Sequence, residues 1–137
     1  MNEALIYIGA AVVMVWGVAH LIPTRPIVRG FGAISADNKK VLAMEVIAEG
    51  LTLIFLGVLP ILVTILAKPE TVKSNLAYIM AGAQSPEPIV YLASAVMLLV
   101  MALLTLFTGA RTKVIWYKIC PLIPTPVAVL YILGAVL

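Results

Sequence analysis

The chain has 137 residues, of which 64% are hydrophobic and 11% are charged, and its formal net charge is +3 at pH 7. A soluble domain carries about 25% charged residues. This composition, with a mean hydropathy of +1.16, therefore excludes a water-soluble fold, a disordered tail and a nucleic-acid-binding module. It predicts an all-α integral membrane protein of one domain, residues 1–137, because about four spans of ~20 residues take up most of such a chain.

Four hydrophobic segments predict an antiparallel bundle of four transmembrane helices, at about residues 4–22, 41–67, 88–109 and 114–137. The first span ends at residues 23–26, where two prolines and an arginine interrupt a membrane helix. A loop follows, and residues 35–38 supply the capping residues of the second span. Pro88 stands at the start of the third span, a position that favours proline.

The fourth span is irregular, because three prolines fall within residues 121–126 and the helix must kink or restart there. Either residues 111–119 form an interfacial turn anchored by Trp116 and Tyr117, or the break lies inside the bilayer. In the polar segment between the second and third spans, we expect a short apolar patch at residues 76–83 to lie at the membrane interface.

The distribution of Lys and Arg predicts the orientation, because cytoplasmic loops carry the excess of these residues. The first and third loops hold six of them and the second loop holds two: Arg25, Arg29, Lys39, Lys40, Arg111 and Lys113, against Lys68 and Lys73. We therefore expect the first and third loops in the cytoplasm and both termini outside, in a prokaryotic inner membrane. Since the charges form no basic cluster in the sequence, the net charge is interpreted as a sign of this topology.

Charged residues inside the spans indicate a candidate site, since each costs ~2.5–3.5 kcal/mol at mid-membrane on insertion scales. Glu45 and Glu49 are four residues apart and share one face of the second span. Glu45 lies near the helix N-terminus, which favours a negative charge, whereas Glu49 lies one turn deeper. His20 lies one turn inside the cytoplasmic end of the first span.

These three residues share a layer near the cytoplasmic face with three others, and we expect the six to line one ligand-binding pocket: His20, Glu45, Glu49, Trp16, Thr105 and Lys118. Some of these six residues, taken individually, also have other interpretations. Glu45 is also explained as an interfacial residue paired with Lys118 or Arg111. His20 is equally explained as a packing residue bonded to a glutamate. Cys120 is interpreted as an inert small residue, and as the only cysteine it excludes an internal disulfide.

Metal and haem chemistry find little support in the sequence. His20 with two carboxylates resembles a set of metal ligands, but no Glu-x-x-His or His-x-x-x-His motif is present, so we predict no metal ligand. A haem held by two histidines would need two protomers, and a His/Met haem would have to use Met44 or Met14, so haem is disfavoured. There is no glycine loop for a nucleotide, and the only nucleophile–base pair to consider is His20 with Cys120. No catalytic residue is assigned.

Two stretches resemble the DoxX-like family of membrane proteins. Residues 17–23, Gly-Val-Ala-His-Leu-Ile-Pro, resemble that family's Gly-x-x-His/Lys-hydrophobic-x-Pro pattern. Residues 45–53, followed by Gly57, are similar to its second helix, where a glutamate precedes a Gly-Leu-rich run. The resemblance implies a four-helix bundle. It also implies kinship with subunits of membrane oxidoreductases that pass electrons to quinone, often beside a soluble partner that holds the redox chemistry.

We therefore expect an accessory or quinone-associated subunit of a membrane oxidoreductase, in which His20 and Glu49 hydrogen-bond a quinone oxygen or relay its proton. Quinone is therefore the expected cofactor, and haem is disfavoured. A purely structural, anchoring subunit without a ligand is the first alternative. A small proton-coupled transporter acting as an oligomer is the second, favoured if the break at residues 121–126 lines a cavity. The expected partners are the lipid bilayer and either further copies of the chain or other membrane or peripheral subunits, with no nucleic acid.

Overall fold

The computed structural model describes residues 1–67, 86–111 and 118–137, with the backbone alone at residue 110. The expected interfacial patch at residues 76–83 and the expected anchors Trp116 and Tyr117 lie outside these residues. The described part is helical throughout and has no strand, which confirms the all-α prediction there. Its elements are α1 (Glu3–Leu21), α2 (Thr24–Gly30), α3 (Ala36–Leu66), α5 (Glu87–Phe107) and α7 (Pro124–Val136), with the short 3-10 helices η1 (Gly109–Arg111) and η2 (Cys120–Leu122).

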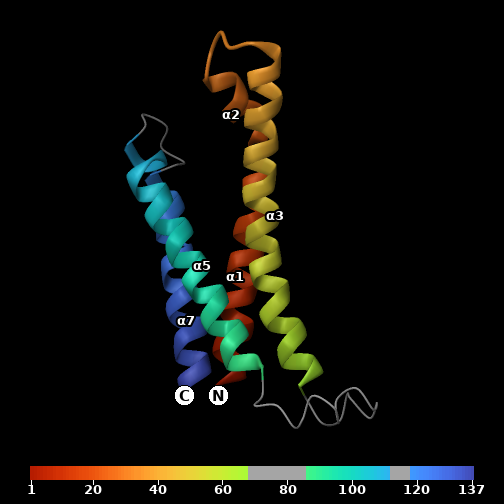
Figure 1. The fold of residues 1–137 in the computed structure, drawn as a ribbon, viewed down its shortest axis with the longest axis vertical. Helices are drawn as coiled ribbons and strands as arrows, with labels where there is room; N and C mark the ends of the chain where they lie inside the picture. The colour runs from red at the N-terminus through yellow and green to blue at the C-terminus, as the bar shows by residue number, and fades with distance from the viewer. Residues whose placement is uncertain (68–85, 112–117) are drawn as a thin grey trace.

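The four longer helices run alternately up and down, so that both chain termini lie at the same end of the molecule (Figure 1). Helix α1 packs against α3 and α7, and α5 packs against α7 and α3. The fully buried side chains lie where these helices meet: Ile6, Val13, Leu53, Tyr91, Leu98, Val127 and Tyr131. With α2, the upper part of α3 extends past α5 at the end opposite to the termini (Figure 1).

Three helices, α1, α3 and α5, are long and apolar enough to cross a membrane. The fourth apolar segment, Cys120–Val136, is shorter. The expected restart at residues 121–126 is present, because η2 ends at Leu122 and a new helix begins at Pro124. A proline fits the first turn of a helix, where its missing N–H is not needed, so the proline cluster ends one helix and starts the next.

The predicted loop after the first span contains a helix. Pro23 interrupts α1, and the Thr24 hydroxyl donates to the Leu21 carbonyl at 2.9 Å, which satisfies an acceptor at the helix end. Pro26 then falls in the first turn of α2, where proline is tolerated. Helix α3 begins at Ala36 rather than near residue 41, because the Ser35 side chain caps it and accepts a hydrogen bond from the Asn38 N–H at 3.1 Å.

Glycines bring the backbones of α1 and α3 into contact. A Cβ atom added at Gly17 would lie 2.7 Å from the Gly50 carbonyl oxygen, and one added at Gly57 would lie 2.8 Å from the Ala10 carbonyl oxygen. Both distances are too short for a real side chain, so these positions admit no residue larger than glycine without separating the helices. This contact fixes how the polar residues on the two helices face each other.

A proline inside α3 is compensated by a tyrosine from α7, and a tyrosine from α5 bonds Thr64 one turn later. Pro60 has no N–H, so the Leu56 carbonyl one turn earlier lacks its usual partner within the helix. The Tyr131 hydroxyl of α7 donates to that carbonyl at 2.9 Å. The Thr64 hydroxyl donates to the Pro60 carbonyl at 2.7 Å, and because its one proton is then used, the Tyr91 hydroxyl of α5 donates to Thr64 Oγ1 at 2.5 Å.

Candidate functional site

His20 is the most buried of the six residues expected to line the pocket, with 8% of its surface exposed. Its Nδ1 lies 3.0 Å from the Trp16 carbonyl oxygen, one turn earlier in α1. Because a carbonyl only accepts, Nδ1 carries the proton. The Trp16 ring stands edge-on to the imidazole, with 5.0 Å between ring centroids and an interplanar angle of 74°. The ring of His20 is thereby held in one orientation, with Nε2 directed away from its own helix turn.

Two further groups meet His20 at Nε2. The Cys120 Sγ lies 3.3 Å from this nitrogen, and the Glu49 Oε1 lies 3.8 Å from it. In the neutral imidazole, Nε2 holds a lone pair and accepts from the Cys120 thiol. In the protonated imidazolium, Nε2 becomes a donor and faces the carboxylate of Glu49. Nε2 of His20 therefore has a thiol and a carboxylate as its two neighbours.

Three elements far apart in the sequence supply these groups. His20 lies in the last turn of α1, Glu49 lies in α3 beside Gly50, and Cys120 begins η2. The close approach of Gly17 and Gly50 brings Glu49 toward His20. The side chain of Glu49 is 32% exposed, whereas that of His20 is 9% exposed. The carboxylate therefore connects the buried imidazole with the surface of the molecule.

The other predicted site residues lie outside this contact set, apart from Trp16. Glu45 is exposed and Lys118 is exposed, and Thr105 donates its hydroxyl proton to the Met101 carbonyl of its own helix at 2.8 Å. Within the described ranges, no hydrogen bond or ion pair joins any of these three to His20 or to one another. The guanidinium of Arg111, considered as a partner of Glu45, lies over the Phe107 ring, 5.7 Å from its centroid.

A metal ion would find few ligands at this site. Over the described part of the chain, no three His, Cys, Asp or Glu side chains are grouped so that they could hold a metal ion. The polar atoms that could face an organic ligand are the Nε2 of His20 and the carboxylate of Glu49.

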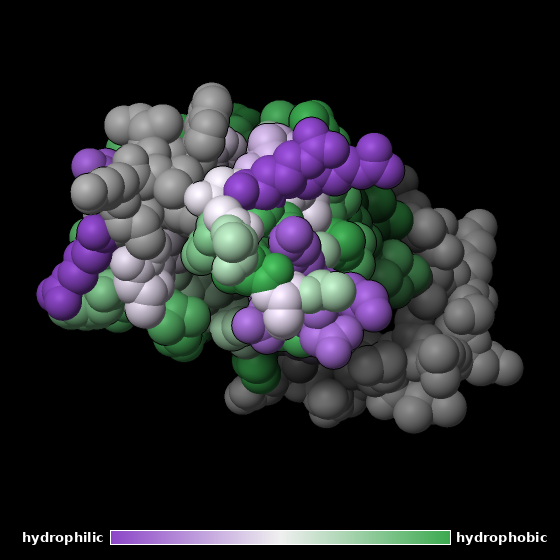
Figure 2. Space-filling view, turned by 90° about the horizontal axis from the view of Figure 1, so that it is seen from above, coloured by the Kyte–Doolittle hydropathy of each residue, from purple (hydrophilic) through white to green (hydrophobic). Residues whose placement is uncertain are grey.

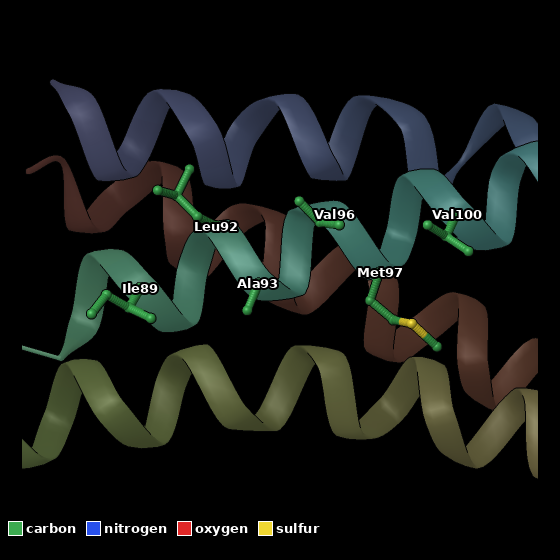
Figure 3. Close-up of a pocket in the computed structure, with 6 residues that line it drawn as sticks. All are labelled: Ile89, Leu92, Ala93, Val96, Met97 and Val100. Carbon is green, nitrogen blue, oxygen red and sulfur yellow. The ribbon is translucent and has the colours of Figure 1, made fainter.

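A hollow on the described surface lies away from this site. It is a groove of about 510 Å³ along α5, and all of its lining residues come from that helix and are apolar: Ile89, Leu92, Ala93, Val96, Met97 and Val100. Figure 3 shows these side chains spread along α5, with α3 running beside it. Such a surface offers no hydrogen bond to a ligand, so it contributes contact area without chemical selectivity.

Other buried polar groups were not selected from the sequence. The contacts around Pro60 are formed by Thr64, Tyr91 and Tyr131. Pro60 lies within a predicted span, and this feature of the sequence could have indicated that polar partners lie nearby. Glu87 and Ser94 of α5 are 6% and 2% exposed, and Glu87 Oε2 and Ser94 Oγ have no hydrogen-bond partner among the described residues. Glu87 stands at the very start of α5.

Comparisons with family models, with curated proteins and with solved structures found no match for this chain. The assignment of function therefore depends on the chemistry of the His20 site.

Proposed function

We propose that this chain is a multi-pass membrane protein. Three of its helices have the length and apolar composition that a bilayer requires. Large apolar side chains are also exposed on the outward faces of all three, as at Val15, Phe55 and Leu104, which are 71%, 57% and 63% exposed. A soluble monomer rarely exposes apolar surface on this scale. Lipid chains are the solvent that suits these faces, and the positive charges near α2 favour placing that end in the cytoplasm.

We further propose that the chain serves as a quinone-associated subunit of a membrane oxidoreductase, and that His20 and Glu49 handle the proton of the quinone. The observation that carries this proposal is the contact between a buried imidazole in the last turn of α1 and a partly exposed carboxylate near the middle of α3. Ionisable residues within apolar helices mark ligand sites and proton relays more often than structural positions. The resemblance to DoxX-like proteins points to the same class of function.

The chemistry assigns one task to each group. Reduction of a quinone to a quinol consumes two electrons and two protons, and the electrons would come from a partner subunit. A protonated His20 donates from Nε2 to a reduced quinone oxygen, and Glu49 returns a proton to the imidazole from the aqueous side. The Trp16 carbonyl keeps Nδ1 protonated throughout, so that Nε2 is the nitrogen that exchanges.

Quinone binding can be measured by the fluorescence of Trp16, because its ring contacts His20. The Trp116→Phe variant serves as the background, since it leaves Trp16 as the only tryptophan. Protein in detergent micelles is titrated with decylubiquinone and the quenching of emission is followed. We expect saturable quenching that is weakened about 10-fold or more by His20→Gln and by Glu49→Gln, since the hydrogen bond of each to the ligand contributes about 1.5–3 kcal/mol.

Glu45→Gln is the matched control. It makes the same chemical change one turn away on α3, at an exposed residue without contact to His20. Quenching that persists in the control and is lost in the two site variants supports the proposal. Equal quenching in all four proteins would show that quinone only partitions into the micelle, and the proposal would then be wrong.

A structural role is the second candidate, and one observation favours it. Both ring nitrogens of His20 already have partners within the protein, so the contact of α1, α3 and η2 is complete without a ligand. Native mass spectrometry of gently extracted protein separates the two roles. A small molecule lost in His20→Ala and Glu49→Gln identifies a ligand site, whereas a change in partner polypeptides or copy number identifies an assembly contact.

The third alternative, a proton-coupled transporter, has less support. Residues 121–126 line neither the groove along α5 nor the pocket between α2 and α3. A proteoliposome assay without pH-dependent uptake would remove it.

A further inference from the structure

A second candidate site lies at the end of the molecule where α2 packs against the start of α3. There the surface is hollowed into a pocket of about 400 Å³, lined by Thr24, Arg25, Val28, Arg29, Gly32, Lys39 and Ala43. Three of these seven residues are basic and none is acidic. In the sequence the three cations are spread over fifteen positions, which is why they do not stand out as a cluster.

The local backbone explains how the cations come together. Arg25 and Arg29 are four residues apart in α2, so they share one face of that helix. Helix α2 ends at Gly30, and Gly32 then adopts a φ of +73°, a conformation that glycine takes without strain. The Gly32 N–H donates to the Arg29 carbonyl at 3.1 Å, which fixes the reversal. Lys39, in the first turn of α3, is thereby placed at the same pocket.

Among the described residues, no ion pair neutralises the positive charge of this pocket. Between residues 22 and 44 the sequence holds one carboxylate, that of Asp37. Its Oδ1 lies 3.3 Å from Lys40 Nζ, and Lys40 does not line the pocket. In the ranges that the structure describes, no ion pair uses Arg25, Arg29 or Lys39. An anion from outside the chain is therefore the natural partner, and two arginines with a lysine suit a phosphate group.

Exposed apolar surface lies next to the pocket. It favours a phosphate that is attached to a lipid over a soluble phosphate, because only a lipid has acyl chains to cover this surface. Ile22 lies two residues before Thr24 and is 77% exposed, Phe31 follows α2 and is 50% exposed, and Val41 is 53% exposed. Figure 2, which looks onto this end, shows hydrophilic side chains gathered beside hydrophobic surface. The cations also stand just beyond the apolar runs of α1 and α3, at the depth of lipid headgroups if these helices cross a bilayer.

We propose that the pocket formed by α2 and α3 binds the phosphate of an anionic phospholipid headgroup through Arg25, Arg29 and Lys39. The acyl chains of this lipid lie along the exposed apolar surface below the pocket. The proposal rests on the membrane insertion proposed above but not on the quinone site, from which its residues are distinct. A bound lipid at this position would anchor α2 and hold the cytoplasmic end of α3 against the membrane surface.

The test uses the full chain, delipidated in detergent and titrated with phosphatidylglycerol or phosphatidylcholine while native mass spectrometry counts bound lipids. We expect tighter binding of phosphatidylglycerol, and a loss of about 30-fold in Arg25→Gln/Arg29→Gln, because each cation near an anionic lipid contributes about 5-fold. Lys39→Gln, a milder change, should weaken binding about 5-fold. The control Lys40→Gln/Arg111→Gln removes two charges outside the pocket and should keep the preference for phosphatidylglycerol.

Each result supports or overturns the proposal. A preference that survives in Arg25→Gln/Arg29→Gln, or that the control variant loses to the same extent, would show that net charge and not the pocket attracts the lipid. Glycerol 3-phosphate is added as a competitor that lacks acyl chains. If it displaces the lipid at equal concentration, the pocket is a site for soluble phosphates and the lipid assignment is wrong. Circular dichroism of each variant confirms that the helices are intact.

Discussion

Removal of the Tyr131 hydroxyl tests whether the proline in α3 is compensated from another helix. In Tyr131→Phe the ring still fills its buried position, but the Leu56 carbonyl loses its donor at 2.9 Å. Pro60 cannot replace that donor, because its nitrogen carries no hydrogen. The substitution therefore leaves a buried acceptor unsatisfied and creates almost no cavity.

The expected magnitude follows from this geometry. An unsatisfied buried acceptor costs about 1–3 kcal/mol, and hydrogen bonds between membrane helices contribute about 0.6 kcal/mol on average and at most about 1.7. We therefore expect Tyr131→Phe to lower the free energy of unfolding by about 1–2 kcal/mol. Tyr91→Phe should have a smaller effect, because Thr64 keeps its own bond to the Pro60 carbonyl.

A double-mutant cycle with Pro60→Ala isolates the contact. Alanine at position 60 restores the N–H that bonds the Leu56 carbonyl within α3, so Tyr131→Phe should then cost less than about 0.5 kcal/mol. The assay is equilibrium unfolding in mixed micelles of a mild detergent and dodecyl sulfate, followed by circular dichroism. If Tyr131→Phe costs the same with and without Pro60, the hydroxyl does not serve the carbonyl that the proline frees, and this reasoning is refuted.

Four further predictions follow from the packing and capping of individual residues. Gly50→Ala should destabilise the fold by about 1–3 kcal/mol, because the added Cβ would lie 3.0 Å from the Gly17 carbonyl oxygen. Gly30→Ala, which meets open space, should be neutral or stabilising by up to about 1 kcal/mol in the same unfolding assay. Ser35→Ala removes the cap of α3 and should cost about 1 kcal/mol; no change in the unfolding midpoint would contradict the cap. Cys120, 6% exposed, should react with N-ethylmaleimide at least 10-fold more slowly in the native micelle than after unfolding, and equal rates would contradict its burial.

Much of the helical plan could be predicted from local chemistry. Prolines and charges mark the end of α1, Ser35 marks the start of α3, and the prolines at residues 121–126 mark the restart before α7. These signals act over a few residues, because capping and the missing N–H of proline are local effects. Helix α2 was not predicted. Its seven residues contain a proline and two arginines, and their apolar residues do not recur at helical spacing.

The candidate site could be predicted only in part, and for a physical reason. The sequence alone placed His20 and Glu49 at similar depths, because depth follows from the position of a residue within its span. Which residues face each other depends on the rotation of each helix about its axis, and that rotation is decided by packing. Cys120, expected to be inert, lies 3.3 Å from His20, whereas the exposed Glu45 makes no contact with it.

The sequence by itself determined that this chain forms apolar helices of membrane-spanning length and where most of them begin and end. The tertiary structure decided which residues contact each other across helices. Glycines at residues 17 and 50 set the distance between α1 and α3, and Tyr131 donates a hydrogen bond to the Leu56 carbonyl that Pro60 frees. It also gathered three cations from two elements into one pocket. Helix formation follows from neighbours along the chain, whereas a site follows from side chains that meet only when the helices pack.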